Sequence, residues 1–506
     1  MHWSLWVSCS MASALTMAGS AASVPPPGIA VLPGEARAES VRTSESSLFD
    51  GARVSLRGAR GETLAVQVRS PGGLSPSARL VLPGDVATVS AFSVRALRVR
   101  SPSTDLYGPS AGPGVYPDVL TPEAGDVHAP LAYFDVAIRS GTVPGKYEGE
   151  LVVGAHRYPV SLTVTHASID VTRAPLVWVF YLPKEIARVH GLDDDDGAGE
   201  LAKEREYVEL FRAHGALLAS DLPPRRFEAR RQFMHDVAFW PVAIDTSSDA
   251  AIESDTRAWL ALFQGTGVTP FAIPVDEPGD DAARSRVRHI AEVIGHAGGG
   301  RPRLLRAVTD VASPVYGDTM DVFISPANIP GARADREGRG ERFWTYNGKP
   351  PRAGSATLDT EGGGLRTWGW IAERYDVPLW YAWEGLYFSD RYNGGGPTDV
   401  LSDPITFDER RHGGTDFGNG DGVLAYPGPL PSLRLKALRR GLEDRLLLEE
   451  LRACGAVAEA DRIAKAVVPR ALGEAAGRPS WPTTDTAWAS AHDRVLDAIE
   501  VGCDGR

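Results

Sequence analysis

Two adjacent carboxylates, Asp276 and Glu277, come directly after an apolar run, Phe271-Ala272-Ile273-Pro274-Val275, and before Pro278. The run has the composition of a buried strand, and Pro278 biases Glu277 towards extended backbone. Neighbouring carboxyl groups at a strand end suit general acid–base chemistry, because like charges this close resist ionising together. The spacing alone is equally compatible with solvated loop carboxylates or with a cap on the following helix.

The second chemical region is the aromatic segment 377–393, in which a strand ends in Trp380-Tyr381-Ala382-Trp383-Glu384. Five of the twelve tryptophans lie between Trp344 and Trp383. An indole ring offers an apolar face and a polar edge, so it makes a good platform for a sugar ring. We expect at least half of these tryptophans to fill the core, and Trp383 or Trp344 to contact a sugar.

The remaining candidates for substrate contact lie at the ends of predicted strands. Together with the two tryptophans they form this set: Tyr181, Asp310, Trp344, Tyr346, Trp383 and Glu384. The catalytic candidates are Asp276 and Glu277, and no residue pattern indicates a metal or a cofactor, since the eleven histidines have no metal-ligand spacing.

Residues 51–172 alternate apolar and polar side chains, as in Leu64-x-Val66-x-Val68 and Phe134-x-Val136-x-Ile138. Turn residues separate these short runs, for example Pro144-Gly145. Period-two runs with regular turns are typical of antiparallel strands. This part of the chain is therefore predicted to be an antiparallel β-sandwich domain.

From 173 to 455 the apolar runs become continuous and alternate with helical patterns. Continuous strands between amphipathic helices indicate a parallel sheet that is covered on both faces. A (β/α)8 TIM-type barrel accounts for this length, and a doubly wound sheet is less favoured because no glycine-rich phosphate turn follows the first strand. The predicted strands are 176–181, 236–244, 269–275, 303–309, 320–324, 342–346 and 378–383.

Composition excludes several classes of protein. The chain of 506 residues has 53 basic and 65 acidic residues, a net charge of -12, and no run of basic residues. Nucleic acid and anionic membrane surfaces are therefore unlikely partners, and no later apolar run is long enough to span a membrane. Of the three cysteines, only Cys454 and Cys503 lie outside the leader, so the mature chain allows at most one disulfide.

The two ends of the chain differ from the middle. Residues 1–22 are apolar and end in small side chains, which predicts a signal peptide, and residues 23–50 are predicted to be a linker. Residues 456–506 are alanine-rich and predicted to be a helical segment. The leader predicts a secreted, periplasmic or cell-surface protein.

With these residues in view, the chain resembles glycoside hydrolase family 123 and its uncharacterised bacterial relatives over most of its mature length. The most specific of the matching segments is 431–444, whereas the Asp276-Glu277 pair alone would be weak evidence for the family. The resemblance rests on these segments: 59–63 (ARGET), 115–120 (VYPDVL), 144–149 (PGKYEG), 275–278 (VDEP), 419–422 (NGDG), 426–428 (YPG) and 431–444 (PSLRLKALRRGLED).

This resemblance implies a β-sandwich followed by a (β/α)8 barrel, and a β-N-acetylgalactosaminidase that retains anomeric configuration with help from its substrate. In that mechanism the 2-acetamido carbonyl attacks the anomeric carbon. Asp276 orients the acetamido group while an oxazoline forms, and Glu277 protonates the leaving oxygen and then activates water. A carbohydrate, glycan or glycoconjugate, is the implied partner.

Two alternatives remain open at this stage. In the first, Glu277 is the acid/base and Glu384 a true nucleophile, which requires carboxyl groups roughly 5–5.5 Å apart. In the second, the barrel is degenerate and the protein binds carbohydrate at a surface without catalysis, because a fold does not fix a function.

Overall fold

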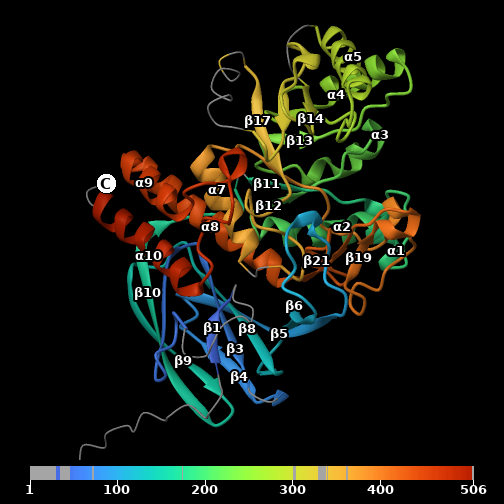
Figure 1. The fold of residues 1–506 in the computed structure, drawn as a ribbon. Coiled ribbons are helices and arrows are strands. Elements are labelled where there is room, and N and C mark those ends of the chain that lie inside the picture. The colour runs from blue at the N-terminus through green and yellow to red at the C-terminus, as the bar shows by residue number, and fades with distance from the viewer. Residues whose placement is uncertain are drawn as a thin grey trace, which may run out of the picture.

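The computed structural model describes residues 30–34, 46–70, 73–173, 175–299, 304–328, 338, 340–360 and 363–503. The predicted leader lies outside these residues. Figure 1 shows two β-sheets at one end of the molecule and a larger parallel sheet with its helices at the other end. Three helices near the C-terminus, drawn in orange to red, lie where the two parts meet.

The first part consists of two five-stranded sheets. One has the order β1 (Ala30–Pro33), β3 (Thr63–Arg69), β8 (Leu131–Ile138), β5 (Ala87–Val99) and β6 (Gly114–Glu123). The other has the order β2 (Val54–Arg60), β10 (His156–Ser168), β9 (Gly145–Val153), β4 (Ser77–Val81) and β7 (Val127–His128). All neighbours are antiparallel except β10 and β2.

Alternation explains why these segments form sheets. In β3 the side chains of Leu64, Val66 and Val68 are buried in one core together with Leu151 and Val160 of the second sheet. Both sheets therefore contribute to one apolar layer, as the period-two pattern predicts. The segment predicted as a linker, 23–50, contributes more than a connection, because its residues 30–33 form the edge strand β1.

The second part is a curled sheet of eight parallel strands. Their order is β12 (Ala216–Leu218), β11 (Val177–Val179), β18 (Trp380–Ala382), β17 (Arg342–Tyr346), β16 (Val322–Ile324), β15 (Leu305–Val308), β14 (Thr269–Ala272) and β13 (Phe239–Pro241). The pairing of β18 with β11 joins the last strand to the first. Within the described residues no ladder joins β12 to β13, so the curled sheet is open at this seam.

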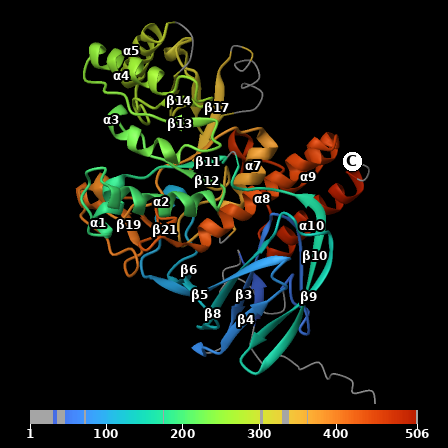
Figure 2. The same ribbon diagram turned by 180° about the vertical axis from the view of Figure 1, so that it is seen from behind.

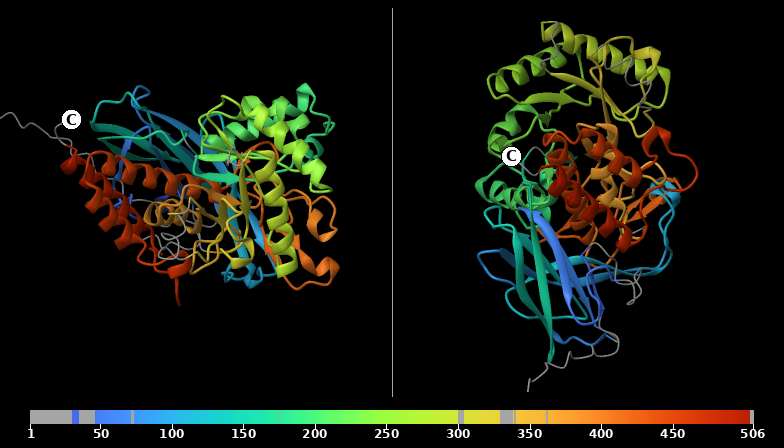
Figure 3. Two further views of the ribbon diagram at one scale, coloured as in Figure 1. Left: turned by 90° about the horizontal axis from the view of Figure 1, so that it is seen from above. Right: turned by 90° about the vertical axis from the view of Figure 1, so that its left-hand side faces the viewer.

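Helices connect most of these strands and cover the sheet. Figure 2 shows α2 crossing below β12, and Figure 3 shows α4 and α5 at the end farthest from the paired sheets. The helices are α1 (Pro183–Val189), α2 (Ala198–Arg212), α3 (Pro224–Phe227), α4 (Asp249–Leu262), α5 (Asp281–Ala297), α7 (Thr367–Tyr375), α8 (Leu433–Ala453), α9 (Val457–Val467) and α10 (Asp485–Gly502). Side-chain oxygens of Ser248, Asp280, Ser432 and Thr484 cap α4, α5, α8 and α10.

Shorter elements complete the connections. They are the 3-10 helices η3 (Asp105–Tyr107), η4 (Glu228–Phe233), η5 (Pro314–Tyr316), η6 (Gly364–Arg366), η7 (Arg391–Asn393), η8 (Glu409–His412) and η9 (Leu472–Glu474), and the strand pairs β19 (Ile405–Asp408) with β20 (Phe417–Asn419) and β21 (Ala425–Tyr426) with β22 (Leu430–Pro431).

Helix α8 joins the two parts, and five of its ten charged side chains are buried, all of them in its first twelve residues. Arg434 forms an ion pair with Asp118 of β6 at 2.8 Å, and Lys436 forms one with Asp135 of β8 at 2.5 Å. On its other side Gly441 lies against α7, because a Cβ at Gly369 of α7 would collide with the Gly441 carbonyl. The segment 431–444 is therefore a charged connection between the sheets and the parallel core.

The C-terminal helices are held by a disulfide. Cys454, at the end of α8, bonds to Cys503, at the end of α10. The one pairing that the sequence allowed is thus formed. No helix among the described residues is long and apolar enough to cross a membrane.

Candidate active site

Asp276 and Glu277 follow β14, and one hydroxyl group connects them. Thr309, which follows the neighbouring strand β15, donates a hydrogen bond from Oγ1 to Asp276 Oδ1 at 2.6 Å. The same Oγ1 accepts a hydrogen bond from the Glu277 backbone N–H at 2.7 Å. Because β14 and β15 pair in parallel, their carboxyl ends bring these three residues together.

Glu277 has a left-handed backbone with φ of 44°. Side chains of consecutive residues in a regular strand point to opposite faces, and a left-handed residue interrupts that alternation. The left-handed region costs a non-glycine residue about 1–3 kcal/mol, and such residues concentrate at functional sites. β14 ends at Ala272, so Asp276 and Glu277 lie in an irregular segment beyond it, and Glu277 is not extended as Pro278 led us to expect. An irregular backbone is the condition under which both carboxylates can face one cleft.

Two tyrosines face this pair. Tyr346, at the end of β17, donates a hydrogen bond from its hydroxyl to Glu277 Oε1 at 2.7 Å. Burial and the carboxylates of Glu277 and Asp276 raise the pKa of Tyr346 above its ordinary value, so it remains a donor at any working pH. Burial, with Asp421, Glu277 and Asp276 among the nearby charges, also raises the pKa of Tyr107. Both acids therefore lie near both hydroxyls.

Tyr107 comes from the β-sheet part of the chain, in the loop between β5 and β6. Several hydrogen bonds hold this loop against the parallel-sheet part; among them, Ser103 Oγ and Ser110 Oγ donate to Asp359 at 2.6 and 2.5 Å, and the Thr104 N–H donates to the Phe417 carbonyl at 3.0 Å. The Tyr107 hydroxyl accepts a hydrogen bond from Asn347 Nδ2 at 3.3 Å. The site is therefore built from both parts.

A cavity of about 650 Å³ opens beside Glu277, within the range of about 300–1,000 Å³ typical of small-molecule sites. Its walls are Leu106, Tyr107, Glu277, Pro326, Tyr346, the segment 347–352 and residues 475–477. Three regions far apart in the sequence therefore meet around Glu277: the β5–β6 loop, the segment after β17 and the segment after η9.

Two further carboxyl groups lie close to this region. Burial and the nearby Asp276 carboxylate raise the pKa of Asp221, which follows β12, to about 7. Burial raises the pKa of Asp421 to about 7 as well, although Asp421 Oδ1 accepts a hydrogen bond from Trp383 Nε1 at 3.1 Å. Near neutral pH both groups can carry a proton, so they can donate as well as accept hydrogen bonds.

Among the predicted sugar contacts, Tyr346 and Trp383 lie at the site. Tyr346 contacts Glu277 directly. Trp383 is partly exposed and donates from its backbone N–H to Asn347 Oδ1 at 3.0 Å, which connects it to the cavity wall. Its ring packs near Tyr387 and Tyr392, at 5.0 and 5.9 Å between centroids. The aromatic segment after β18 therefore forms a partly exposed cluster of rings, with Trp383 tilted against both tyrosines, next to the Asn347 wall of the cavity.

The other four predicted contacts are engaged elsewhere. Trp344 is buried between Phe239 and Phe271, and Tyr181 is buried and donates to Glu204 Oε2 at 3.3 Å. Asp310 accepts hydrogen bonds from Arg284 Nε and the Tyr316 hydroxyl at 2.8 and 2.7 Å. Trp344 and Tyr181 are therefore enclosed by protein, whereas Asp310 lies near enough to the site to be one of the charges that raise the pKa of Tyr346.

Glu384 is also engaged, because it is buried and forms an ion pair with Arg391. It is not one of the residues that line the cavity beside Glu277. This placement disfavours the alternative in which Glu384 attacks the anomeric carbon opposite Glu277.

The sequence did not single out Thr309, Tyr107, Asn347 or Asp221. Asp421 lies in the NGDG segment, whose significance was apparent only through the resemblance. Thr309 had one available signal, since it is the last residue of the predicted strand 303–309, which comes next along the chain after the strand that precedes Asp276.

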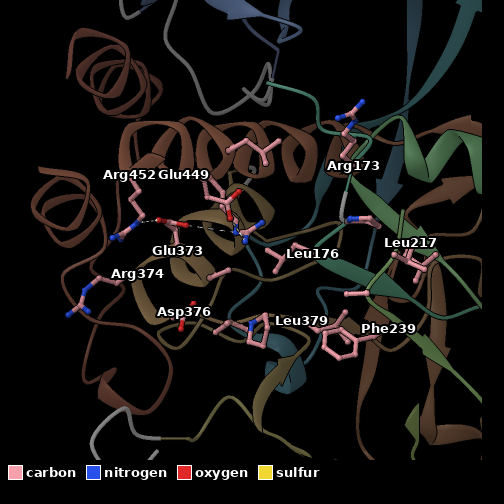
Figure 4. A pocket seen from close by; sticks show the side chains of 18 of the residues that line it. Arg173, Leu176, Leu217, Phe239, Glu373, Arg374, Asp376, Leu379, Glu449 and Arg452 are labelled. Carbon is pink, nitrogen blue, oxygen red and sulfur yellow. Dashed lines mark hydrogen bonds and ion pairs between the residues drawn. The ribbon is translucent and has the colours of Figure 1, made fainter. Parts of the chain in front are cut away.

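A second cavity, of about 620 Å³, lies at the opposite ends of the strands. Leu176, Phe239 and Leu379, at or just before the starts of β11, β13 and β18, line it, as Figure 4 shows. Its charges neutralise one another, since Glu373 forms ion pairs with Arg452 at 2.5 Å and Arg445 at 3.9 Å. Catalytic residues lie at the carboxyl ends of strands in parallel barrels, so this cavity is not a candidate for the chemistry.

Comparison with solved structures identifies the fold. The structure superposes on a family 123 glycoside hydrolase from Clostridium perfringens, described in an analysis of glycolipid glycan hydrolysis, with a TM-score of 0.66. The match covers 94% of this chain and 98% of the other at 12% sequence identity. The fold is that of a family 123 glycoside hydrolase.

Two other solved structures resemble this chain too weakly to indicate its fold or its function. A family 2 glycosyl hydrolase from Bacteroides cellulosilyticus matches with a TM-score of 0.29 at 10% identity over 64% of this chain and 44% of the other. An FMN-binding β-glucuronidase from Facaelibacterium prausnitzii matches with a TM-score of 0.27 at 9% identity over 80% and 59%. Searches of protein-family models and of curated proteins found no match. At these identities the likeness to the family 123 enzyme establishes the architecture, and the activity must be argued from the site.

Proposed function

We propose that this protein is a glycoside hydrolase that removes terminal β-linked 2-acetamido sugars, with N-acetylgalactosamine as the preferred sugar. One observation carries the proposal: Asp276 and Glu277 share the Thr309 hydroxyl at a strand end, and Glu277 borders a ligand-sized cavity. The family 123 fold supports it. We also propose that the curled parallel sheet acts as a (β/α)8-type barrel with its active site at the carboxyl ends of the strands.

In the proposed mechanism the substrate supplies the nucleophile. The carbonyl oxygen of the 2-acetamido group attacks the anomeric carbon as the leaving oxygen departs, which forms an oxazolinium ion. Asp276 accepts a hydrogen bond from the acetamido N–H and stabilises the positive charge that develops there. Because Thr309 already donates to Asp276 Oδ1, we assign the contact with the acetamido N–H to the second oxygen of this carboxylate.

Glu277 carries the proton. It protonates the leaving oxygen in the first step and removes a proton from the attacking water in the second, so the product retains the original configuration. The Tyr346 hydroxyl orients the Glu277 carboxyl through Oε1 in both steps. The reaction is accelerated because the reacting groups are held in position and because fixed dipoles stabilise the charge that develops in the transition state.

Export of the protein is part of the proposal. The chain carries a leader-like segment, 1–22, and the Cys454–Cys503 disulfide. Disulfides persist in oxidising compartments outside the cytosol, so we place the mature enzyme in the periplasm, on the cell surface or in the medium.

The experiment is a comparison of aryl β-glycosides with the purified mature protein. We expect cleavage of the 2-acetamido-galactoside, weaker cleavage of the gluco isomer and none of the plain galactoside, with inhibition by the thiazoline analogue of the oxazoline. Glu277→Gln and Asp276→Asn should each reduce kcat at least 100-fold. The exposed Glu253→Gln on α4 is the matched control and should leave the rates unchanged.

Two outcomes would decide against the proposal. Efficient cleavage of the plain galactoside would remove the role of the acetamido group and restore the two-carboxylate alternative. Sugar binding without cleavage of any glycoside, and with Glu277→Gln binding as the wild type does, would instead identify a non-catalytic carbohydrate-binding protein.

A further inference from the structure

The cavity beside Glu277 lies on one particular side of the proposed reaction centre. Glu277 lines it, whereas Asp276 and Asp221 do not. In the proposed function, on which this inference rests, Asp276 holds the acetamido group of the departing terminal sugar and Glu277 protonates the leaving oxygen. The cavity therefore receives the leaving group, the part of the glycan that remains after cleavage.

The walls of this cavity carry more positively charged than negatively charged side chains. Glu277 is the one carboxylate among the lining residues, and it is protonated when it acts as the acid. Lys349 and Arg352 are the cations. The two tyrosines, Tyr107 and Tyr346, stay neutral because burial raises the pKa of each. During the first step the cavity is therefore a basic pocket in a protein whose net charge is -12.

Arg352 is placed to bind an anion. Its backbone is fixed at both ends, since its N–H donates to the Lys349 carbonyl at 2.9 Å and its carbonyl accepts from the Leu472 N–H at 2.8 Å. Its side chain is exposed on the cavity wall, and within the described part of the chain no carboxylate forms an ion pair with the guanidinium. An exposed guanidinium without a carboxylate partner can donate two parallel hydrogen bonds to the oxygens of a carboxylate or a sulfate.

Lys349 contributes less than Arg352. Its Nζ donates a hydrogen bond to the Asp105 carbonyl, and it lies 3.5 Å from the Asp105 carboxylate. That carboxylate is largely exposed, so it offsets part of the Lys349 charge and leaves Arg352 as the main cation. Pro326, Pro350 and Pro351 supply apolar surface on the same walls, suited to the C–H face of a sugar ring.

We infer that this cavity is a leaving-group subsite for an acidic sugar, in which Arg352 binds a carboxylate or a sulfate ester on the ring next to the scissile bond. The proposed substrates are therefore acidic glycans, in which a terminal 2-acetamido sugar is linked to a uronic acid or to a sulfated hexose. Arg352 is the residue that determines this specificity.

The test compares three disaccharides that differ only in the leaving sugar: 2-acetamido-galactose β-linked to glucose, to glucuronate or to glucose 6-sulfate. We expect the wild type to cleave at least one acidic disaccharide about tenfold more efficiently, in kcat/KM, than the neutral one, as a charge-assisted contact allows. The two acidic arms distinguish a carboxylate from a sulfate. The preference should decrease as ionic strength rises from 20 to 500 mM, because the pocket is open to solvent.

Substitutions test whether Arg352 causes the preference for acidic disaccharides. Arg352→Gln should remove most of the acidic preference, and Arg352→Lys should retain part of it, since it keeps the charge without the fork of donors. Arg257→Gln, which removes an exposed arginine of α4, is the matched control and should keep the full preference. Circular dichroism should show that each variant is folded, and the salt dependence of the wild type needs no variant at all.

The outcomes separate this inference from the proposed function. Equal rates for the neutral and both acidic disaccharides, or a preference that Arg352→Gln leaves intact, would overturn the acidic subsite while the glycosidase proposal stands. If the wild type cleaves no glycoside, the proposed function fails. Calorimetric titration of the same disaccharides into wild type and Arg352→Gln then decides the subsite, and equal affinities would reject it.

Discussion

The ion pair between Asp118 and Arg434 should be one of the strongest single contributions to the stability of the assembled site. It joins β6 of the front sheets to α8, and the two side chains are only 1% and 3% exposed. The Arg434 guanidinium also donates to the carbonyls of Ala356 and Gly420, both at 2.6 Å. Gly420 precedes Asp421, so the pair fixes the loop that supports Trp383.

Asp118→Asn keeps the size of the side chain and removes its charge. Breaking one side of a buried ion pair typically costs about 3–5 kcal/mol, because the other charge stays buried without compensation. Arg434 would keep its two carbonyl acceptors, so we expect the lower end, about 3 kcal/mol of unfolding free energy. Urea unfolding followed by tryptophan fluorescence measures this difference.

A double-mutant cycle makes the test specific. Arg434→Met alone should also destabilise the protein, whereas the double variant should cost clearly less than the sum, by at least ~1.5 kcal/mol. The control is Arg53→Met, which breaks an exposed pair with Glu148 in the same sheets and should cost less than ~1 kcal/mol. Additive effects of the two buried substitutions, or a loss below ~1 kcal/mol for Asp118→Asn, would refute this account.

Three further predictions concern the site and the C-terminal helices. Thr309→Val removes the hydroxyl that Asp276 and Glu277 share and should lower kcat about 10- to 100-fold, with Thr309→Ser restoring most of it; equal rates for Val and Ser would contradict the role. The Asp421 pKa of about 7 lies above its ordinary 3.8, so this group favours folding at low pH and the benefit is lost as pH rises towards 7. The unfolding free energy of Asp421→Asn, measured relative to that of the wild type in urea titrations, should therefore increase by about 2–3 kcal/mol from pH 5 to pH 8. A difference that does not change with pH would argue against this assignment. Replacing Cys454 and Cys503 with serine opens a loop of 49 residues and should cost about 2–4 kcal/mol of unfolding free energy, which calorimetry would register; unchanged unfolding would show that the bridge is dispensable.

Local patterns in the sequence predicted most of the strands. Seven of the eight parallel strands coincide with predicted segments, because a buried parallel strand is a continuous apolar run. The strand β12 was missed, since its three residues, Ala216–Leu218, directly follow a helix and are too few to show a period. The alternating runs of the front sheets predicted β2, β3, β4, β8, β9, β10 and the second half of β5, but they missed β1, β6 and β7, of which β6 has a continuous run of five buried residues and no alternation.

The partners of individual side chains could not be predicted in this way. Trp344 and Trp383 have the same residue type, yet Trp344, in the middle of β17, is enclosed by Phe239 and Phe271, whereas Trp383, directly after β18, is partly exposed. Tyr107 reaches the site from 240 residues before its partner Asn347. No periodicity encodes a contact at that separation, because it depends on how the front sheets pack against the parallel-sheet part.

The segment 431–444 carries the most specific part of the family resemblance, yet its role in this structure is to hold the two parts together and not to contact the substrate. Its charged residues Arg434, Lys436 and Arg439 bind Asp118 and Asp135 of the front sheets, and none of them lines the cavity beside Glu277. The chemistry depends on this segment indirectly. If α8 did not hold the front sheets in place, the β5–β6 loop would not bring Tyr107 to the cavity, and Glu277 would face open solvent on that side. A chain that kept these charges but lost Asp276 or Glu277 would keep the cleft without the reaction, which is why the two acids, and not the more specific motif, must decide the function.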